Sequence, residues 1–101
     1  MPKIIVLFNL KSGVTVADYE KFARETDLPI VNQLPSVNRF EVLRATGLLN
    51  GAAAPYQYIE IIDVKDLGQL GQDVATEQMR GVSSAFRALA DSPQCIVTEQ
   101  V

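Results

Sequence analysis

The chain has no histidine and only one cysteine, and these absences exclude several kinds of site. A structural zinc centre of the Cys/His type needs four such side chains, and a haem held by a proximal histidine needs an imidazole. The lone Cys95 has no partner for a disulfide within the chain. Histidine is also the commonest general base at neutral pH, so acid–base chemistry here must use carboxylates, tyrosine, lysine or water.

The chain also lacks a large excess of charge of one sign and any long apolar run. The nine basic and 12 acidic residues give a net charge of −3, and the basic ones are scattered. Because no basic stripe interleaved with aromatic residues occurs, nucleic acid is not expected as a partner. The longest apolar run, residues 4–8, is far shorter than the roughly 20 residues that cross a bilayer. The N-terminus lacks a signal-peptide pattern. We expect no membrane association and a cytoplasmic location.

What the chain does have is enough apolar material for one core. Of its 101 residues, 48% are hydrophobic, which argues against disorder. The length fits one domain over residues 1–101. A domain of about this size buries only about 60–70% of the surface that its unfolded chain exposes. Contact with a second copy would therefore add burial.

Four apolar, β-branched-rich segments bounded by turn residues are predicted as strands. They cover residues 3–10, 37–45, 56–63 and 94–98, and a hairpin loop, 46–55, lies between the second and the third. In the third strand, Tyr58 and Glu60 point to one face and Ile59 and Ile61 to the other, since side chains alternate along a strand.

Two longer helices are expected between these strands. The first follows Thr15, whose hydroxyl can cap the first turn while Asp18 complements the helix dipole. Pro29 should break this helix and push Leu28 away from helical angles, before a short turn over residues 30–34. The second covers residues 76–90 and is ended by Ser92 and Pro93, after a weak helical piece at 66–73.

This order predicts an α+β protein of the ferredoxin-like βαββαβ type. Right-handed crossovers place both helices on one face of a four-stranded antiparallel sheet, with the first and third strands in its centre. The other sheet face then has no cover within the chain. We therefore expect a homodimer in which two sheets cover each other.

Residues 25–40 resemble the signature of the EthD-like branch of the dimeric α/β-barrel proteins. That signature runs His-x-Pro-Leu, then Leu-Pro-Gly, then Arg-Tyr. The corresponding positions here hold Pro29, Leu34, Pro35, Arg39 and Phe40. The strand over residues 58–63 and the closing strand extend the resemblance over nearly the whole chain. Its nearest form is the RedY-like, or HapK, group, which is associated with prodigiosin-type pigment clusters.

The resemblance implies a sheet-to-sheet dimer and a pocket in each subunit, walled by the helices and one side of the sheet. It also implies cofactor-free chemistry on an aromatic, pyrrole-like or polyketide-like metabolite, such as cyclisation, isomerisation, condensation or oxygenation without a metal. EthD-like proteins usually carry histidine where this chain has Asp27. The position is therefore carried over, but the imidazole is not.

Three residues are candidate catalytic groups: Asp27, Glu60 and Tyr58. Asp27 precedes the expected helix break, where it serves either as a buried general acid or base or as a bond to nearby backbone. A buried glutamate is rare unless paired or functional, so Glu60 is either a second carboxyl group of the site or an ion-pair partner of Arg39. Tyr58 either donates its hydroxyl to a substrate carbonyl or belongs to the core.

Three further residues are candidate substrate contacts. Asn32, one turn beyond Asp27, either orients a ligand or caps the chain. Arg39 either holds an anionic substrate or pairs with Glu41 or Glu60. Tyr19 lies on the inner face of the first helix and fits a core position equally well. Cys95 has no histidine to activate its thiol, and we interpret it as a packing residue.

Two functions are compatible with these residues. In the first, the protein is an enzyme of pigment-type secondary metabolism, Asp27 moves a proton, and Glu60 and Tyr58 orient or polarise the substrate. In the second, the same pocket only holds a hydrophobic or aromatic precursor and presents it to a partner enzyme. A stress-type dimer without small-molecule chemistry is a third possibility.

Overall fold

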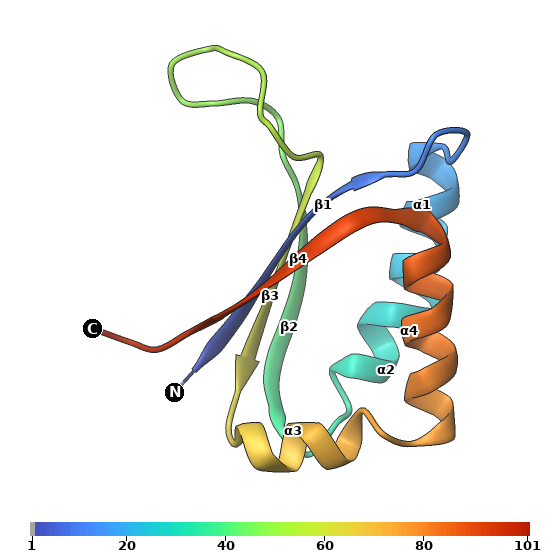
Figure 1. Ribbon diagram of the computed structural model, residues 1–101, viewed down its shortest axis with the longest axis vertical. Coiled ribbons are helices and arrows are strands. Elements are labelled where there is room, and N and C mark those ends of the chain that lie inside the picture. Colours follow the sequence, from blue (N-terminus) through green and yellow to red (C-terminus); the bar gives the residue numbers. More distant parts are fainter. Residues whose placement is uncertain (1) are drawn as a thin grey trace.

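Within residues 2–101, which the computed structural model describes, four strands form one antiparallel sheet in the order β2-β3-β1-β4. The helices lie against one side of this sheet (Figure 1). The strands are β1 (Lys3–Leu10), β2 (Val37–Arg44), β3 (Tyr58–Val64) and β4 (Ala90–Thr98). The helical elements are α1 (Val16–Phe22), η1 (Ala23–Asp27), α2 (Leu28–Val31), α3 (Leu67–Asp73) and α4 (Glu77–Leu89). The α+β, ferredoxin-like βαββαβ prediction is confirmed, with β1 and β3 central.

The two sheet faces differ sharply in burial. On the face toward the helices, Val6 and Phe8 of β1 and Tyr58 and Glu60 of β3 are buried. On the opposite face, the cross-strand partners Ile5 and Ile61 are only half-buried. Apart from the register shifts near the starts of β2 and β4, none of the side chains that alternate onto that face along the described strands is buried. The helices therefore cover one side of the sheet, and we call the other side the open face.

The helix that begins after Thr15 has the predicted start. Thr15 Oγ1 accepts a hydrogen bond from the Asp18 N–H at 3.0 Å, and the Asp18 carboxylate accepts one from the Thr15 N–H at 3.3 Å. This reciprocal capping box satisfies two of the amide groups that have no partner inside the helix.

Pro29 does not break the helix. The helical path runs without interruption from α1 through η1 into α2, and Leu28 keeps right-handed helical angles (φ −58°, ψ −48°). The prediction that Leu28 leaves the helical region is therefore wrong. Its N–H bonds to the carbonyl of Ala23, five residues back, which makes one wide π turn. The wider turn accommodates a proline ring that would strike a carbonyl one turn earlier in a regular α-helix.

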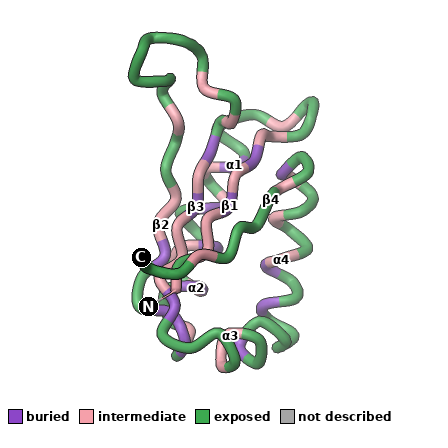
Figure 2. The backbone as a smooth tube through the Cα atoms, turned by 60° about the vertical axis from the view of Figure 1, so that its left-hand side comes forward, coloured by how far each residue is buried: buried purple, intermediate pink, exposed green. Residues whose placement is uncertain are grey.

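The last strand is longer than predicted. Ala90 is already extended and pairs with Leu10, so the helix ends at Leu89 rather than at Ser92 and Pro93. A register shift opposite β1 contains these residues, and Ser92 has a positive φ of 46°. β4 is an edge strand, where proline is tolerated because its missing N–H is not needed by a second neighbour. Most of β4 is exposed (Figure 2).

The helix-facing side holds two packed apolar clusters. In the first, the ring of Phe8 contacts Tyr19 edge-on at 5.3 Å, Tyr58 by stacking at 5.6 Å and Phe86 edge-on at 4.9 Å. The second surrounds Phe40 and includes Met79 of α4. The polar groups of the candidate site, described below, lie against this aromatic cluster.

Asn32 connects α2 to β2. Its amide nitrogen donates to the carbonyls of Leu28 at 2.9 Å and Phe40 at 3.1 Å, and its oxygen accepts from the Phe40 N–H at 2.9 Å. β2 is an edge strand, so Phe40 has no strand neighbour on that side. The side chain of Asn32 therefore stands in for a missing strand.

Replacing Asn32 by alanine should lower the free energy of unfolding by about 1–2 kcal/mol, because a hydrogen bond of this kind contributes about 0.5–1.5 kcal/mol net. Urea unfolding at pH 6 measures the change. Gln33→Ala is the matched control, since Gln33 is the exposed neighbour of Asn32. Equal stabilities for the two variants would contradict the structural role of Asn32.

Candidate functional site

Asp27 is buried against the sheet at the last residue of the π turn. Only 5% of it is exposed, and within residues 2–101 no hydrogen bond to its carboxyl group is found. Burial raises the pKa of Asp27 to about 6, since the charged form loses its hydration. The sequence-based expectation of an inward carboxyl group is met, although a π turn and not a helix break puts it there.

The π turn also decides which neighbours Asp27 meets. In a regular α-helix, eight residues turn about 80° beyond two full turns, so Asp27 would point well away from the face of Tyr19. The wider π turn reduces the rotation per residue. Asp27 and Tyr19 are both buried, and burial, then the charge of Glu60 and then that of Asp27 raise the pKa of the Tyr19 hydroxyl.

Glu60 is the second buried carboxyl group, with 5% exposed. The Tyr19 hydroxyl donates to its Oε2 at 3.1 Å. Burial and the nearby negative charge of Asp27 raise the pKa of Glu60 to about 8, and the Tyr19 hydrogen bond opposes this only in part. The alternative of an ion pair with Arg39 is wrong, because Arg39 lies on the open face and pairs there with Glu41 at 2.6 Å.

Together, Asp27 and Glu60 hold one proton at neutral pH. Burial raises both pKa values, the negative charge of Asp27 raises that of Glu60 further, and no arginine or lysine contributes to the pKa of either group. With pKa values of about 6 and about 8, Asp27 is mainly ionised at pH 7 and Glu60 is mainly protonated. A group that can accept a proton and a group that can donate one thus lie within electrostatic range of each other, an arrangement that suits proton transfer.

Tyr58 lies on the same sheet face as Glu60 but bonds elsewhere. Its hydroxyl donates to Glu20 Oε2 at 2.8 Å, and its ring packs on Tyr19 at a centroid distance of 4.6 Å. Burial, followed by the Glu20 contact, raises the pKa of Tyr58 to about 12. The structure therefore gives Tyr58 a partner other than a substrate carbonyl.

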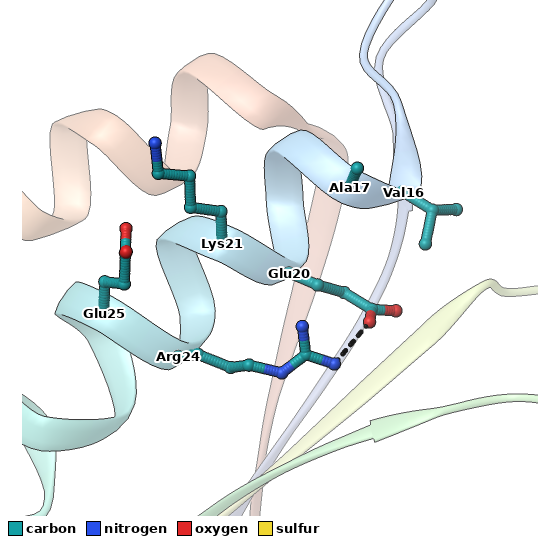
Figure 3. A pocket seen from close by; sticks show the side chains of 6 residues that line it. All are labelled: Val16, Ala17, Glu20, Lys21, Arg24 and Glu25. Atoms are coloured by element: carbon teal, nitrogen blue, oxygen red, sulfur yellow. Dashed lines mark hydrogen bonds and ion pairs between the residues drawn. The ribbon is translucent and has the colours of Figure 1, made fainter.

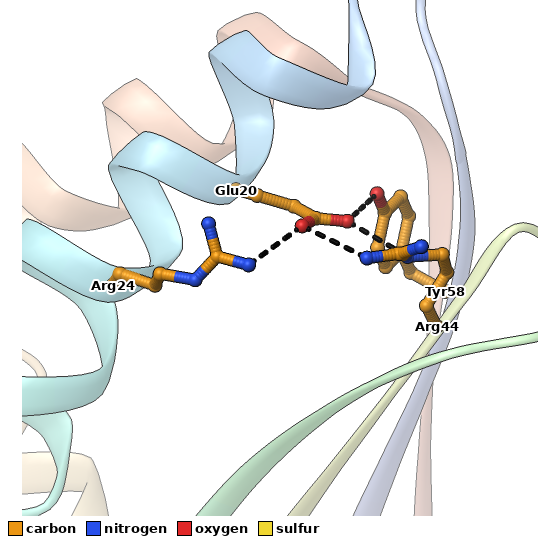
Figure 4. A network of polar contacts seen from close by, with 4 residues as sticks. All are labelled: Glu20, Arg24, Arg44 and Tyr58. Carbon is orange, nitrogen blue, oxygen red and sulfur yellow. Dashed lines mark hydrogen bonds and ion pairs between the residues drawn. The ribbon is translucent and has the colours of Figure 1, made fainter.

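Glu20 gathers a second polar cluster that sequence reasoning missed. Arg44 donates to it through Nε at 2.9 Å and Nη2 at 3.1 Å, and Arg24 donates through Nη2 at 2.9 Å (Figure 4). These hydrogen bonds, led by that of Tyr58, lower the pKa of Glu20. The spacing of Glu20 and Arg24 by four residues was the available signal. Arg44 comes from another element, so no local pattern indicates it.

The remaining predicted residues lie apart from the buried pair. Asn32 uses its amide on the backbone of α2 and β2, which favours the capping interpretation. Arg39 is exposed on the open face, beside Glu41. Cys95 is exposed, so its interpretation as a packed residue is wrong; the edge strand β4 has little cover at that point. Partial desolvation of the thiol and the charge of Glu60 nevertheless raise the pKa of Cys95.

Two hollows meet at Glu20 and Arg24. One, of about 630 Å³, is open and lies on the outer side of α1 and η1 over Val16 and Ala17 (Figure 3). The other, of about 180 Å³, lies between β2 and the first helical segment, which is the continuous helix formed by α1, η1 and α2. Neither is lined by Asp27 or Glu60.

Among the described residues, no group of three or more His, Cys, Asp or Glu side chains could hold a metal ion. No described helix has the length and apolar character to cross a membrane.

Comparison with known proteins gives a consistent assignment. The model of the family described as REDY-like protein HapK matches residues 2–101. The crystal structure of HapK from Hahella chejuensis is 32% identical, with a TM-score of 0.78, and the match covers 100% of this chain and 93% of that chain. No match was found among the curated proteins.

Two more distant structures share the fold. SnoaB from Streptomyces nogalater, described as a cofactor-independent oxygenase, is 16% identical with a TM-score of 0.79, covering 99% of this chain and 92% of that one. A dimeric ferredoxin-like protein of unknown function from Thermobifida fusca is 16% identical with a TM-score of 0.77, covering 98% and 90%. At this identity the two structures show the fold alone. The family match and the 32% identity over the full length establish that the chain belongs to the REDY-like HapK family.

Proposed function

We propose that this chain is a small cofactor-free enzyme of secondary metabolism that transfers a proton on an aromatic, pyrrole-like or polyketide-like intermediate, such as one of prodigiosin-type pigment biosynthesis. The observation that carries this proposal is the buried pair Asp27 and Glu60, whose pKa values of about 6 and about 8 lie on either side of neutrality. Groups tuned in this way are typical of general acid–base sites.

In the proposed reaction, Asp27 accepts a proton from the substrate and Glu60 returns one to an oxygen that gains negative charge. The pair holds one proton before and one proton after the reaction, so an isomerisation or cyclisation is balanced without a co-reactant. Tyr19 is a positioning residue, since its hydroxyl holds Glu60 at 3.1 Å. Tyr58 supplies an aromatic wall through its contacts with Phe8 and Tyr19.

The comparisons support chemistry without a cofactor. SnoaB shares the fold and is described as a cofactor-independent oxygenase. The family match to HapK supports a role close to that of the RedY-like group. Neither names the substrate of this chain, so the substrate class rests on the apolar and aromatic surroundings of the buried pair.

A binding module is the second candidate. Asp27 and Glu60 are each only 5% exposed, so a ligand would reach them only if the helical layer moved. A protein that merely holds a pigment precursor needs no contact with the pair. Chemical conversion of the added compound separates the two functions. A binding module would shift the absorption spectrum of a pyrrole or aromatic polyketide but leave the compound chemically unchanged.

We also propose that residues 1–101 act as one domain in the cytoplasm and form a homodimer through the open face. Three isoleucines form one row across this face, because Ile5 of β1 pairs with Ile61 of β3 on one side and with Ile96 of β4 on the other. Ile96 is 43% exposed. Burial of such a face against a second copy removes apolar surface from water. Structures of the same fold include proteins described as dimeric.

Replacing Asp27 by asparagine should lower turnover of the true substrate by about 10²–10⁴-fold, the usual cost of losing a general base. Turnover is measured by chromatography of candidate pyrroles and aromatic polyketides incubated with purified protein. Glu25→Gln is the matched control, because it removes one carboxylate from an exposed position on the same helical segment. Turnover within about twofold of the wild type in Asp27→Asn would exclude the proposed base.

The buried pair should also make stability fall as pH rises. Both folded-state pKa values are raised, so the stabilisation is complete below the ordinary carboxyl pKa values and is lost between about pH 4 and pH 8. Urea unfolding should therefore give a lower free energy at pH 8.5 than at pH 5.5, by a few kcal/mol. Glu60→Gln should remove most of this difference and Glu25→Gln should retain it. A wild-type protein that is more stable at pH 8.5 would refute the raised pKa values.

Replacing Ile61 by lysine should convert the dimer into a monomer, because the interface would then bury a charge. Light scattering coupled to gel filtration should give twice the chain mass of 11.1 kDa for the wild type and the single mass for the variant. Val74→Lys is the control, since Val74 is 39% exposed and lies in the helical layer. A monomeric wild type at micromolar concentration would rule out the interface.

A further inference from the structure

A half-open cavity of about 180 Å³, the smaller of the two hollows described above, lies between the first helical segment and β2, apart from the buried carboxyl pair. Ala23, Leu28 and Val42 form its apolar lining. A water molecule occupies about 30 Å³ in the liquid, so the cavity has room for a small organic group. The polar groups at its border are those of the Glu20 cluster, and their charges decide what kind of group would bind.

Two positive charges face one negative charge at this border. Arg24 and Arg44 both donate to the carboxylate of Glu20, at distances of 2.9 to 3.1 Å. Each Glu20 oxygen accepts two hydrogen bonds, because Tyr58 supplies the fourth. Glu20 is therefore saturated and ionised, and the cluster as a whole carries an excess of one positive charge.

The guanidinium groups keep further donors. Each has five N–H bonds, and the contacts with Glu20 use Nε and Nη2 of Arg44 but only Nη2 of Arg24. Glu20 holds the two groups from opposite sides, one from the helical segment and one from the sheet (Figure 4). Because Glu20 already restrains both side chains, an incoming anion would pay less of the usual ordering cost.

We propose that this cavity binds the carboxylate of a small apolar or aromatic acid. A guanidinium fork matches a planar carboxylate in charge and geometry. The apolar residues Ala23, Leu28 and Val42 suit the hydrocarbon or aromatic body of such an acid. The open hollow over Val16 and Ala17 shares Glu20 and Arg24 with the cavity, so a larger body has space to extend along α1 (Figure 3).

The charged groups of this site differ from those of the proton-transfer reaction, since neither Asp27 nor Glu60 lines the cavity, although Tyr58 borders both. Loss of catalysis in Asp27→Asn would leave carboxylate binding unchanged. The two proposals can therefore fail separately.

The test is a titration of the purified full chain with benzoate and, separately, with benzamide, followed by amide chemical shifts in NMR at low salt. Benzamide has the same ring and no charge. We expect benzoate to bind at least tenfold more tightly, with the largest shifts at Ala23, Val42 and Arg44. Equal binding of both compounds, or shifts centred elsewhere, would overturn the site.

Arg24→Gln provides the second arm of the test. It removes one guanidinium and leaves the contacts of Glu20 with Arg44 and Tyr58, so the variant should fold. We expect about tenfold weaker benzoate binding, the usual order for a lost charge-assisted hydrogen bond. Arg80→Gln is the matched control, because Arg80 is exposed on α4 and does not line the cavity. If both variants weaken binding equally, benzoate responds only to net charge and the site is refuted.

Discussion

Pro29 has no amide hydrogen and leaves no room for a carbonyl one turn before it, and the first helical segment is built around that restriction. The chain meets it with a single π turn, in which the Leu28 N–H bonds to the carbonyl of Ala23. The helix continues, so the covering layer of the sheet stays intact. The change in rotation also decides which side chains before the proline face the sheet, and Asp27 is among those that do.

Both candidate sites depend on this turn. The last residue of η1 is Asp27, which is buried near Glu60, and the second is Arg24, which reaches the carboxylate of Glu20. Helices cover only one side of the sheet, so polar side chains that point to that side must be satisfied by the helical segment. Tyr19 and Glu20 are adjacent in sequence and satisfy different strand positions, Glu60 by one hydrogen bond and Tyr58 by another.

Local signals in the sequence predicted much of this arrangement. Thr15 and Asp18 occupy capping positions that depend only on nearby backbone, and strand alternation put Tyr58 and Glu60 on the buried face. Local signals were insufficient where the outcome depends on distant partners. The early start of β4 needs β1 as its neighbour, the partner of Glu60 comes from α1, and Arg44 meets Glu20 across 24 positions. Pro29 misled the prediction because its steric rule concerns regular α-helices, not π turns.

Glu20 and Glu60 show how surroundings set the role of the same side chain. Each accepts a hydrogen bond from a tyrosine, and the two tyrosine rings are in contact at 4.6 Å. Glu20 also accepts from two guanidinium groups, which keep it charged; it serves as a fixed anchor. Burial and, after it, the nearby negative charge of Asp27 raise the pKa of Glu60, which has no cation among its described partners and so keeps its proton. The two arginines thus belong to the Glu20 cluster. The carboxyl groups without a cation, which can exchange a proton, are Asp27 and Glu60.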